Sequence, residues 1–476
     1  MSEARSHAGL ASRSMLIDSA ILREYDVRGI VGAGLNAEVV EALGRAIGTE
    51  AAKHEQTAVA VARDARLTSD ALQRALVRGL RASGRDVIDI GRVPTPVLNF
   101  ATHSLGTGAG VMVTASHNPA EYNGLKIVVG GRTLSGEEIR ALGQRVATSD
   151  FVVGAGGYRR ADVVPAYIER IVGEIALQRP LHVVIDAGNG IAGAVAPALF
   201  RALGCRVEAL FCELDGRFPN HHPDPTVPAN LQSLRERVHL AGADVGLAFD
   251  GDGDRLGVVD NAGNIIWPDR QLMLFASDIL KRSKAGTPIV YDVKCSSALA
   301  DVSREHGGTP VMWKAGHSLI REKLRATGAP LGGELTGHLF FADRWYGFDD
   351  ALYAGARLLE LLAAAKAASA EVFAALPNRL STPELRIDLK PGEPQLLMKE
   401  LARAHPPEFA QAQVTTIDGV RADFAHGWGL VRASNTTPSL VLRFEGINDA
   451  ALDDICALFQ AWLHRVRADL TVPAFR

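Results

Sequence analysis

Three aspartates at alternate positions lie in the stretch Asp-Gly-Asp-Gly-Asp-Arg at residues 250–255. The carboxylates of Asp250, Asp252 and Asp254 repel one another when the intervening glycines let the loop tighten. Such a cluster is stable with a bound cation, and an all-oxygen ligand set suits Mg²⁺. The loop does not match an EF-hand, because Arg255 occupies the position of its glycine. Since apolar runs flank it closely on both sides, we favour a metal site over an acidic surface turn.

A single serine, Ser116, follows an apolar run and stands beside His117 in the stretch Thr-Ala-Ser-His-Asn-Pro. A serine hydroxyl is a weak nucleophile without a neighbouring base or charge. Adjacent side chains of an extended segment point to opposite faces, so we do not expect these two residues to form a catalytic pair. The G-x-S-x-G elbow is absent, which argues against an acyl hydrolase. A phosphorylated serine supplies an oxygen ligand to Mg²⁺, so the serine and the acidic loop together predict a phosphoryl relay.

A third polar stretch, Arg-Ala-Ser-Asn-Thr-Thr-Pro, lies between two apolar runs near the C-terminus. Its candidate phosphate-binding residues are Arg432, Ser434, Asn435 and Thr436. Arginine binds phosphate through two parallel N–H bonds, and hydroxyl and backbone groups fill the remaining acceptor oxygens. The stretch therefore suits a phosphate-binding loop, although a plain polar turn has the same composition.

A fourth stretch, Gly-Glu-Leu-Thr-Gly-His, places Glu334, Thr336 and His338 on a glycine-rich turn. A carboxylate and a hydroxyl two residues apart can together hold vicinal hydroxyl groups of a sugar. A helix-capping turn has a similar sequence, so this stretch taken alone is weak support for a sugar site.

The elements that position these loops repeat along the chain. Three β-rich runs end in Asp64, Asp186 and Asp292, and each is followed by a helical pattern, a glycine and a second apolar run. The three glycines are Gly84, Gly204 and Gly307. A helix between two strands indicates a parallel crossover, so the pattern predicts three similar mixed α/β domains. The last hundred residues lack this strand–helix–strand unit, and their pattern predicts an α+β domain. The expected domains are residues 1–160, 161–264, 265–375 and 376–476.

The bulk composition is that of an ordinary soluble protein. The 476 residues are 47% hydrophobic and 22% charged, with a formal net charge of −3. This balance argues against nucleic acid as the main partner. The four cysteines form no CxxC pair and are expected to be reduced. We find no apolar run long enough to span a membrane and no secretory signal at the N-terminus, so we expect a cytoplasmic protein.

Taken together, the four loops resemble the α-D-phosphohexomutase family, most closely its bacterial phosphomannomutase/phosphoglucomutase group. The four loop sequences occur in the order and spacing of the family, and the likeness covers nearly the whole chain after residue 20. Further matching segments are Arg-Glu-Tyr-Asp-Val-Arg-Gly at residues 23–29, Tyr-Asn-Gly-Leu-Lys-Ile, Asp-Val-Lys-Cys-Ser and Trp-Lys-Ala-Gly-His-Ser.

The resemblance implies an intramolecular phosphotransferase that interconverts hexose 1-phosphate and hexose 6-phosphate, with mannose, glucose or both as the sugar. It implies a phosphorylated Ser116, Mg²⁺ held by this serine and the three aspartates, and hexose 1,6-bisphosphate as intermediate and activator. It also implies four domains, three of them alike, around a central cleft, which agrees with the repeats. We expect small sugar phosphates as partners and a monomer or weak dimer.

The resemblance also assigns residue roles. Arg28, Lys126 and His338 are candidates for orienting or shuttling the hydroxyl proton, with no single general base chosen, and His117 accompanies them at the catalytic centre. The implied substrate-binding residues are Tyr25, Lys294, His317, Glu334, Thr336, Arg432, Ser434, Asn435 and Thr436. The methyl group of Thr336, where the family commonly carries serine, can crowd one epimer, so the preference between mannose and glucose stays open.

Three alternatives to this function stay open at the level of the sequence. The first is a phosphoglucosamine mutase, which shares the serine and the acidic loop but departs further in its sugar loop. The second is a sugar-phosphate phosphatase, in which water accepts the phosphoryl group. The third is a catalytically silent sugar-phosphate binding protein, for which an intact serine beside a metal site has no use.

Overall fold

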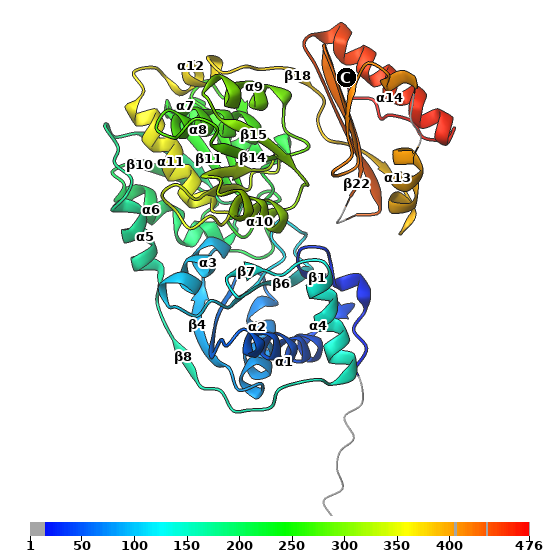
Figure 1. The fold of residues 1–476 in the computed structure, drawn as a ribbon. Helices are drawn as coiled ribbons and strands as arrows, with labels where there is room; N and C mark the ends of the chain where they lie inside the picture. The colour runs from blue at the N-terminus through cyan, green and yellow to red at the C-terminus, as the bar shows by residue number, and fades with distance from the viewer. Residues whose placement is uncertain (1–14, 404–406, 435–436, 476) are drawn as a thin grey trace, which may run out of the picture.

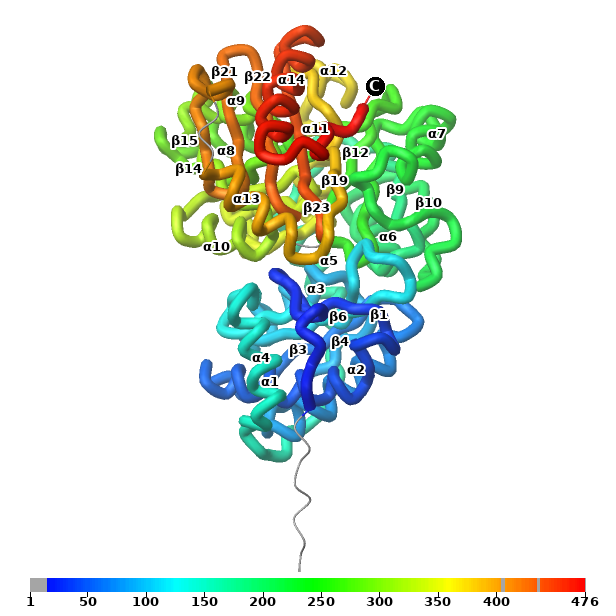
Figure 2. Tube along the Cα trace, turned by 90° about the vertical axis from the view of Figure 1, so that its right-hand side faces the viewer, coloured from blue at the N-terminus to red at the C-terminus, as the bar shows by residue number. Residues whose placement is uncertain are grey.

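Four β-sheets follow one another along the chain in the computed structural model, which describes residues 15–403, 407–434 and 437–475. The first three sheets are mixed, and the fourth is antiparallel throughout. We number the domains by their sheets. Domain 1 lies at one end of the molecule, and the other three domains lie together at the opposite end (Figure 1, Figure 2).

Domain 1 is built on a sheet with the strand order β2-β1-β6-β5-β3-β4-β8, in which β7 also pairs with β6. Its strands are β1 (Val27–Val31), β2 (Gly34–Leu35), β3 (Ala58–Arg63), β4 (Asp86–Arg92), β5 (Gly110–Val113), β6 (Tyr122–Val129), β7 (Arg132–Thr133) and β8 (Tyr158–Arg160). Side chains alternate along β3, so Val59 and Val61 pack on one face of the sheet and Ala60 and Ala62 on the other.

Helices cover both faces of this sheet. Helices α1 (Ala37–Lys53), α2 (Ser69–Ala82) and α4 (Glu137–Thr148) bury their apolar sides on one face, and α3 (Thr95–Ser104) covers the other. Helix α1 begins where the side chain of Asn36 accepts a hydrogen bond from the amide of Val39 at 2.9 Å.

The predicted strand–helix–strand unit is present three times. Its copies are β3-α2-β4, then β9 (His182–Asp186), α6 (Ala196–Ala202) and β10 (Arg206–Leu210), and then β14 (Pro288–Asp292), α9 (Ser297–Glu305) and β15 (Thr309–Trp313). The two strands of each copy pair in parallel. After each helix the predicted glycine has a positive φ angle, 78° at Gly84, 91° at Gly204 and 77° at Gly307.

Each domain then adds a third parallel strand and an antiparallel partner. These pairs are β5 with β6, β11 (Val245–Phe249) with β12 (Leu256–Asp260), and β16 (Leu331–Gly333) with β17 (Leu339–Phe341). The turn inside each pair contains one of the chemically distinctive loops: Ser116 in domain 1, Asp250 to Asp254 in domain 2 and Glu334 to His338 in domain 3. The same topological position is therefore used for three different tasks.

Domains 1, 2 and 3 share one continuous hydrophobic core. It includes buried aromatic residues such as Phe100 on α3, Phe200 on α6 and Tyr353 on α11 (Ala351–Ala364). The remaining elements around it are α5 (Val164–Val172), α7 (Gln232–Ala241), β13 (Ile265–Ile266), α8 (Pro268–Leu280), α10 (His317–Thr327) and α12 (Ser369–Ala374). None of the helices within the described ranges is long and apolar enough to cross a membrane.

Domain 4 has its own core. Its antiparallel sheet contains β18 (Leu380–Ser381), β19 (Leu385–Asp388), β20 (Gln413–Thr415), β21 (Val420–Phe424), β22 (Gly427–Ala433) and β23 (Ser439–Gly446). Helices α13 (Glu393–Arg403) and α14 (Asp449–Val466) pack on it, and α14 runs along the sheet in Figure 1. The predicted α/β class, with three similar mixed domains and a C-terminal α+β domain, is confirmed.

Truncating the centre of this last core is expected to destabilise domain 4. Trp462 is fully buried against Phe409 and Phe459, with ring centroids 5.0 and 5.6 Å away. Trp462→Ala should lower the free energy of unfolding of domain 4 by about 3–5 kcal/mol, because it leaves a cavity. Urea denaturation followed by circular dichroism measures the loss. The control Leu396→Ala, at a side chain that is 62% exposed, should change it by at most about 0.5 kcal/mol. A loss below about 1 kcal/mol for Trp462→Ala would contradict the packing.

Candidate functional site

Ser116 lies fully inside the protein, just after β5, with its hydroxyl aimed at the acidic loop. Its Oγ donates a hydrogen bond to Oδ2 of Asp250 at 2.7 Å. Its amide donates to Oγ1 of Thr114 at 2.9 Å, and its carbonyl accepts from the guanidinium of Arg66 at 2.7 Å. These three hydrogen bonds hold the hydroxyl, the amide and the carbonyl of Ser116 in place.

The expected divergence of Ser116 and His117 is wrong. Nδ1 of His117 lies 3.1 Å from Oγ of Ser116. The cause is local, because Ser116 has a φ angle of 51° and the backbone is therefore not extended at this residue. Burial, together with the positive charges of Arg255 and Arg28, lowers the pKa of His117 well below its usual value, so the ring is neutral at pH 7.

The acidic loop gathers its three carboxylates around one point. One oxygen each from Asp250, Asp252 and Asp254 lies within 4.8 Å of the other two, and all three side chains are buried. Oδ1 of Asp250 accepts from the amides of Gly253, Asp254 and Arg255 at 3.0–3.2 Å. The loop's own backbone thus holds this carboxylate in place.

Domain 1 supplies the partners of the other two aspartates. Oδ2 of Asp252 accepts from Oγ1 of Thr95 and from Nζ of Lys126, both at 2.6 Å, and Lys126 also donates to Asp254. Burial alone lowers the pKa of Lys126, but the three aspartates outweigh it and raise the pKa, so the ammonium stays charged. Burial and repulsion from its two neighbours raise the pKa of Asp250 well above its usual value.

The donor set fits a divalent cation. The Oδ1 atoms of Asp252 and Asp254 are buried and have no hydrogen-bond partner among the described residues. Unpartnered buried carboxylate oxygens are costly, and a hard cation satisfies them. Lys126 and Arg255, whose Nε lies 4.0 Å from Oδ2 of Asp250, offset part of the negative charge, and the two unpartnered oxygens leave room for a further cation.

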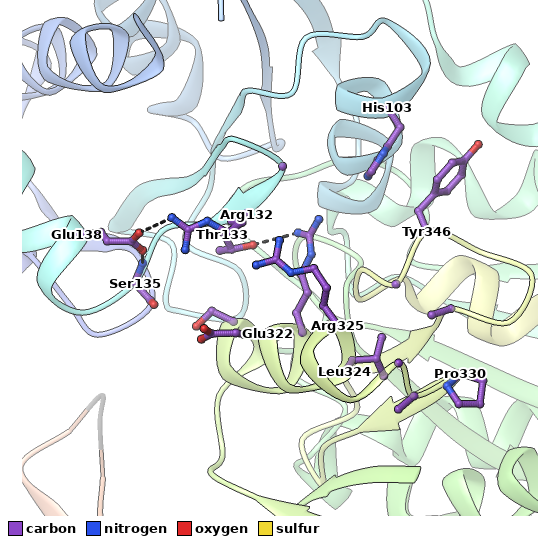
Figure 3. A pocket seen from close by; sticks show the side chains of 17 residues that line it. His103, Arg132, Thr133, Ser135, Glu138, Glu322, Leu324, Arg325, Pro330 and Tyr346 are labelled. Carbon is purple, nitrogen blue, oxygen red and sulfur yellow. Dashed lines mark hydrogen bonds and ion pairs between the residues drawn. The ribbon is translucent and has the colours of Figure 1, made fainter. Parts of the chain in front are cut away.

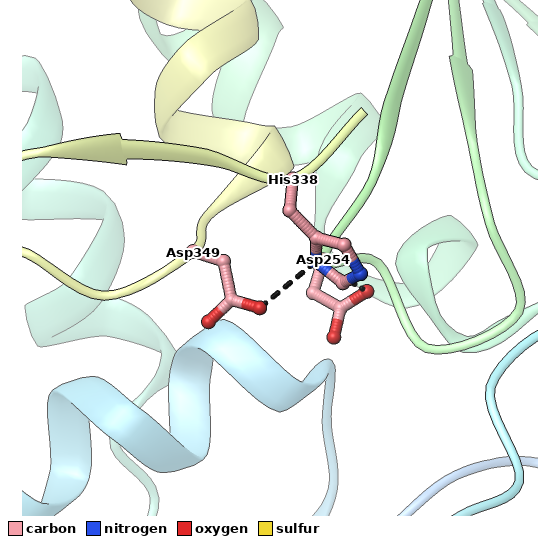
Figure 4. A group of neighbouring side chains, drawn as sticks. All are labelled: Asp254, His338 and Asp349. Atoms are coloured by element: carbon pink, nitrogen blue, oxygen red, sulfur yellow. Dashed lines mark ion pairs between the residues drawn. The ribbon is translucent and has the colours of Figure 1, made fainter. Parts of the chain in front are cut away.

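His338 joins the sugar loop to the acidic loop. Its Nδ1 lies 2.9 Å from Oδ2 of Asp349 and 3.6 Å from Oδ1 of Asp254 (Figure 4). Its Nε2 accepts a hydrogen bond from Nε of Arg255 at 3.0 Å. Burial lowers the pKa of His338, and the two carboxylates outweigh it and raise the pKa. Because arginine can only donate, the ring in this geometry carries its proton on Nδ1, toward Asp349.

Tyr25, His317 and Glu334 lie beside this histidine. The ring of His317 stacks on that of His338 with centroids 5.3 Å apart, and Tyr25 approaches His317 edge-on at 5.6 Å. Oε2 of Glu334 accepts from the amide of Gly316 at 2.7 Å, whereas its Oε1 is buried without a described partner. Nε2 of His317 is likewise buried and unpartnered in the described part of the chain.

The phosphate loop of domain 4 is tied to domains 1 and 3 through one aspartate. Oδ2 of Asp418 accepts from Nε of Arg432 at 3.1 Å and from the amide of Ala315 at 2.9 Å. The carbonyl of Ala315 in turn accepts from the hydroxyl of Tyr25 at 2.7 Å. Oγ of Ser434 accepts from the amide of Thr437 at 3.2 Å. Asn435 and Thr436 lie outside the described residues.

The remaining predicted residues occupy the same region. Arg28 donates from Nη1 to Oδ1 of Asn118 at 2.5 Å, next to the Ser116 segment, and its Nε bonds Asp26. Lys294 is buried, 3.4 Å from Glu384 of domain 4. Oγ1 of Thr336 is buried without a partner among the described atoms, and the residue lines a small crevice beside Trp267.

Sequence reasoning missed several residues of this cluster: Arg66, Thr95, Asp349, Glu384 and Asp418. Arg66 and Thr95 hold Ser116 and Asp252, and Asp349 orients His338. Glu384 pairs with Lys294, and Asp418 pairs with Arg432. Asp349 had a weak signal, because it belongs to an Asp-Asp pair directly before a helix. Arg66, Glu384 and Asp418 lie in loops and Thr95 is the first residue of α3, and only the tertiary fold brings them to the site.

Four family models match the chain in succession. They are the phosphoglucomutase/phosphomannomutase alpha/beta/alpha domain I at residues 19–153, domain II at 165–263, domain III at 267–380 and the C-terminal domain at 393–461. The matched segments cover most of the chain and follow the order of the four sheets.

Similar proteins agree over nearly the full length. A phosphomannomutase/phosphoglucomutase of Pseudomonas putida is 50% identical over 457 residues, which are 96% of this chain and 98% of that protein. A phosphoglucomutase of Neisseria gonorrhoeae is 49% identical over 446 residues, covering 93% and 96% of the two chains. The crystal structure of a phosphoglucomutase/phosphomannomutase family protein from Burkholderia thailandensis matches with a TM-score of 0.91 and 50% identity, covering 96% of this chain and 100% of that one.

The environment of His317 makes a prediction about pH. Burial, assisted by His338 and Lys126, lowers the pKa of His317 to about 4, although Asp349 opposes the shift. The folded protein therefore disfavours the charged ring, and this residue's share of stability is lost as the pH falls from about 6.5 toward 4. NMR titration of the ring should show a neutral His317 from pH 5.5 to 8. A midpoint near 6.5 for His317 would show that the site is solvated.

Proposed function

The chain belongs to the phosphoglucomutase/phosphomannomutase family and interconverts hexose 1-phosphates and hexose 6-phosphates, and we propose that Ser116 is its phosphoryl carrier. One observation supports this role above the others: the buried Ser116 hydroxyl lies 2.7 Å from a carboxylate of the acidic loop. A phosphoryl group on this oxygen adjoins a cation site and the Lys126 ammonium.

The proposed cation is Mg²⁺, held by Asp250, Asp252, Asp254 and a phosphoryl oxygen on Ser116. The all-oxygen donor set, with two unpartnered carboxylate oxygens, favours this ion over zinc or copper. When bound, the ion neutralises charge on the phosphoryl oxygens during transfer. Lys126 already bridges two of these aspartates, so it positions the loop from the domain 1 side.

The first transfer proceeds from phosphorylated Ser116 to the free hydroxyl of a hexose monophosphate. The bond between Ser116 Oγ and phosphorus breaks, and a bond between phosphorus and the sugar oxygen forms. The sugar hydroxyl gives up its proton and the departing Ser116 oxygen takes one up, so the serine is restored as a hydroxyl. The product is hexose 1,6-bisphosphate. After this intermediate has turned over in the site, its other phosphoryl group returns to Ser116, and the isomeric monophosphate leaves.

Cationic and imidazole groups flank the transfer point. Arg28 and Lys126 act as charge clamps, because an arginine keeps its proton and Lys126 is held charged by three aspartates. His338 is the candidate proton carrier, because two carboxylates raise the pKa of its ring and Asp349 orients it. His117, which is neutral and 3.1 Å from Ser116, positions the serine oxygen.

The opposite side of the site holds the sugar and its distal phosphate. Glu334, Thr336 and His317 offer buried polar atoms that have no partner among the described residues and that match sugar hydroxyls. Tyr25 and Lys294 seat the ring beside them. The distal phosphate binds Arg432 together with Ser434, Asn435 and Thr436, because a guanidinium and hydroxyls satisfy phosphate oxygens. A single pocket of this kind accepts either end of the bisphosphate, and we propose turnover of both mannose and glucose phosphates.

The proposal extends to the setting of the enzyme. We propose that it works in the cytoplasm, as a monomer or weak dimer, on freely diffusing sugar phosphates. Cys205, Cys212 and Cys295 carry no disulfide, which suits a reducing compartment. The domain boundaries at residues 160, 264 and 375 are part of the same proposal.

Removing the carrier oxygen is the direct experiment. Ser116→Ala should lower kcat by about 10³-fold or more, because the covalent relay is lost. A coupled assay with Mg²⁺, glucose 1-phosphate or mannose 1-phosphate and a trace of the 1,6-bisphosphate measures hexose 6-phosphate. Mass spectrometry should detect phosphate on Ser116 of the active protein. The exposed Ser104, changed to alanine, serves as the matched control. Turnover within tenfold of the unmodified enzyme would exclude Ser116 as the carrier.

Arg432→Ala tests the phosphate pocket. The change should chiefly raise KM, by about ten- to a hundredfold, because a charge-assisted hydrogen bond contributes about 1.5–3 kcal/mol. Arg465→Ala on α14 is the control, since that side chain pairs with the surface residue Glu408. Steady-state kinetics with glucose 1-phosphate separates KM from kcat. An unchanged KM would show that Arg432 does not contact the substrate.

A further inference from the structure

A separate cavity of about 430 Å³ lies where domain 1 meets domain 3 (Figure 3). The β6–β7 hairpin of domain 1 forms one wall, with Arg132 and Thr133, and helix α10 of domain 3 forms the other. None of its lining residues belongs to the catalytic cluster described above. The volume is within the usual range for small-molecule sites.

The wall formed by α10 carries two arginines without a salt-bridge partner among the described residues. Arg321 and Arg325 are one turn apart on the face that begins with His317, and neither lies within ion-pair distance of a described carboxylate. Two like charges at this spacing destabilise a helix slightly unless a counter-charge is present. Burial lowers the pKa of Arg321, the charge of Asp349 opposes this shift, and Arg325 lowers the pKa further. A bound anion would offset the effects of burial and of Arg325.

Hydroxyl groups accompany the arginines. Ser318 is 6% exposed and lines the cavity, and its Oγ is buried without a hydrogen-bond partner in the described residues. Nη1 of Arg321 donates to Oγ1 of Thr133 at 3.0 Å across the domain boundary. An unpartnered hydroxyl beside unpaired guanidinium groups is a donor set suited to the oxygens of a phosphate.

The carboxylates of the cavity do not cancel this charge. Glu138 is held by Arg132 at 3.0 Å and by the amide of Ser135 at 3.2 Å. Glu322 is exposed, also lines the cavity, and forms no ion pair with a described residue. The described lining therefore carries three arginines (Arg132, Arg321 and Arg325) against two carboxylates (Glu138 and Glu322), an excess of one positive charge.

We propose that this cavity binds a small molecule carrying a phosphate group, held by Arg321, Arg325 and Ser318 at the boundary between domains 1 and 3. The site is distinct from the pocket around Arg432 and does not depend on the proposed catalytic roles.

Binding here acts on the spacing of the two domains that hold the catalytic cluster. Helix α10 begins at His317, and Arg325 lies eight residues later, which is about 12 Å along the helix axis. The hairpin on the other wall continues directly from β6, which carries Lys126. A phosphate between the two walls adds charge-assisted bonds to a boundary that Arg321 now bridges through Thr133 and Asn99. It therefore stabilises the present spacing of domain 1 and domain 3.

The experiment uses the full-length chain and inorganic phosphate as the probe. Isothermal titration calorimetry is performed on Arg432→Gln, which weakens phosphate binding at the substrate pocket, without Mg²⁺ or hexose and against potassium chloride of equal ionic strength. We expect one binding event to remain. Adding Arg325→Gln should weaken it by about tenfold, as expected for loss of a charge-assisted bond.

Arg325 is exposed, so its replacement should leave the melting temperature unchanged, and thermal unfolding checks this. Arg321→Gln should weaken binding at least as much. The matched control is Arg304→Gln on α9, an exposed arginine outside the cavity, which should not affect the titration. Absence of phosphate binding in the Arg432→Gln protein, or binding that is equal with and without Arg325, would overturn the proposal. Neither result bears on Ser116, because the readout is binding and not turnover.

Discussion

The burial of three carboxylates within reach of one another is the constraint on which the rest of the structure depends. Each buried charge costs several kcal/mol unless it is paired, so Asp250, Asp252 and Asp254 cannot be enclosed by domain 2 alone. Domain 1 contributes the ammonium of Lys126 and the hydroxyls of Thr95 and Ser116, and domain 3 contributes His338. The interface between the three domains therefore also compensates the charge of the acidic loop, and the residues that do so surround the oxygen of Ser116.

The topology explains how three domains deliver groups to one place. In each of them the working loop is the turn between the third parallel strand and its antiparallel neighbour. Loops at the carboxyl ends of parallel strands lie at one edge of a sheet, so each domain faces the site with the same edge. The scaffold is repeated while the turn sequence differs: a serine in one copy, three aspartates in the next and a glutamate with a histidine in the third. Function here is a property of the turns, and the strands only orient them.

Much of the fold and of the candidate site was predictable, because short motifs and the strands and helices beside them can be recognised from neighbouring residues in the sequence. The three strand–helix–strand units followed from runs ending in Asp64, Asp186 and Asp292, and the metal loop followed from its alternating glycines. The approach of His117 to Ser116 was not predictable, because it depends on the positive φ angle of a non-glycine residue. The role of Asp418 was also not predictable, because Ala315 lies 103 residues away in domain 3 and Arg432 lies 14 residues away on another element of domain 4. Contacts between residues of different domains produce no periodic pattern in the sequence, so they cannot be predicted from it.

The Asp418 carboxylate has a consequence for how ligand enters. Its Oδ2 accepts from Nε of Arg432 and from the Ala315 amide, and the Ala315 carbonyl accepts from the Tyr25 hydroxyl of domain 1. Under the proposed function, a phosphate that binds Arg432 therefore meets an arginine that already has one carboxylate partner. Domain 4 keeps other bonds to domain 3, because Arg421 donates to the carbonyl of Val293 at 2.7 Å and Arg443 to that of Lys294 at 2.6 Å. Phosphate capture then changes the partners of one arginine and leaves the two domains joined.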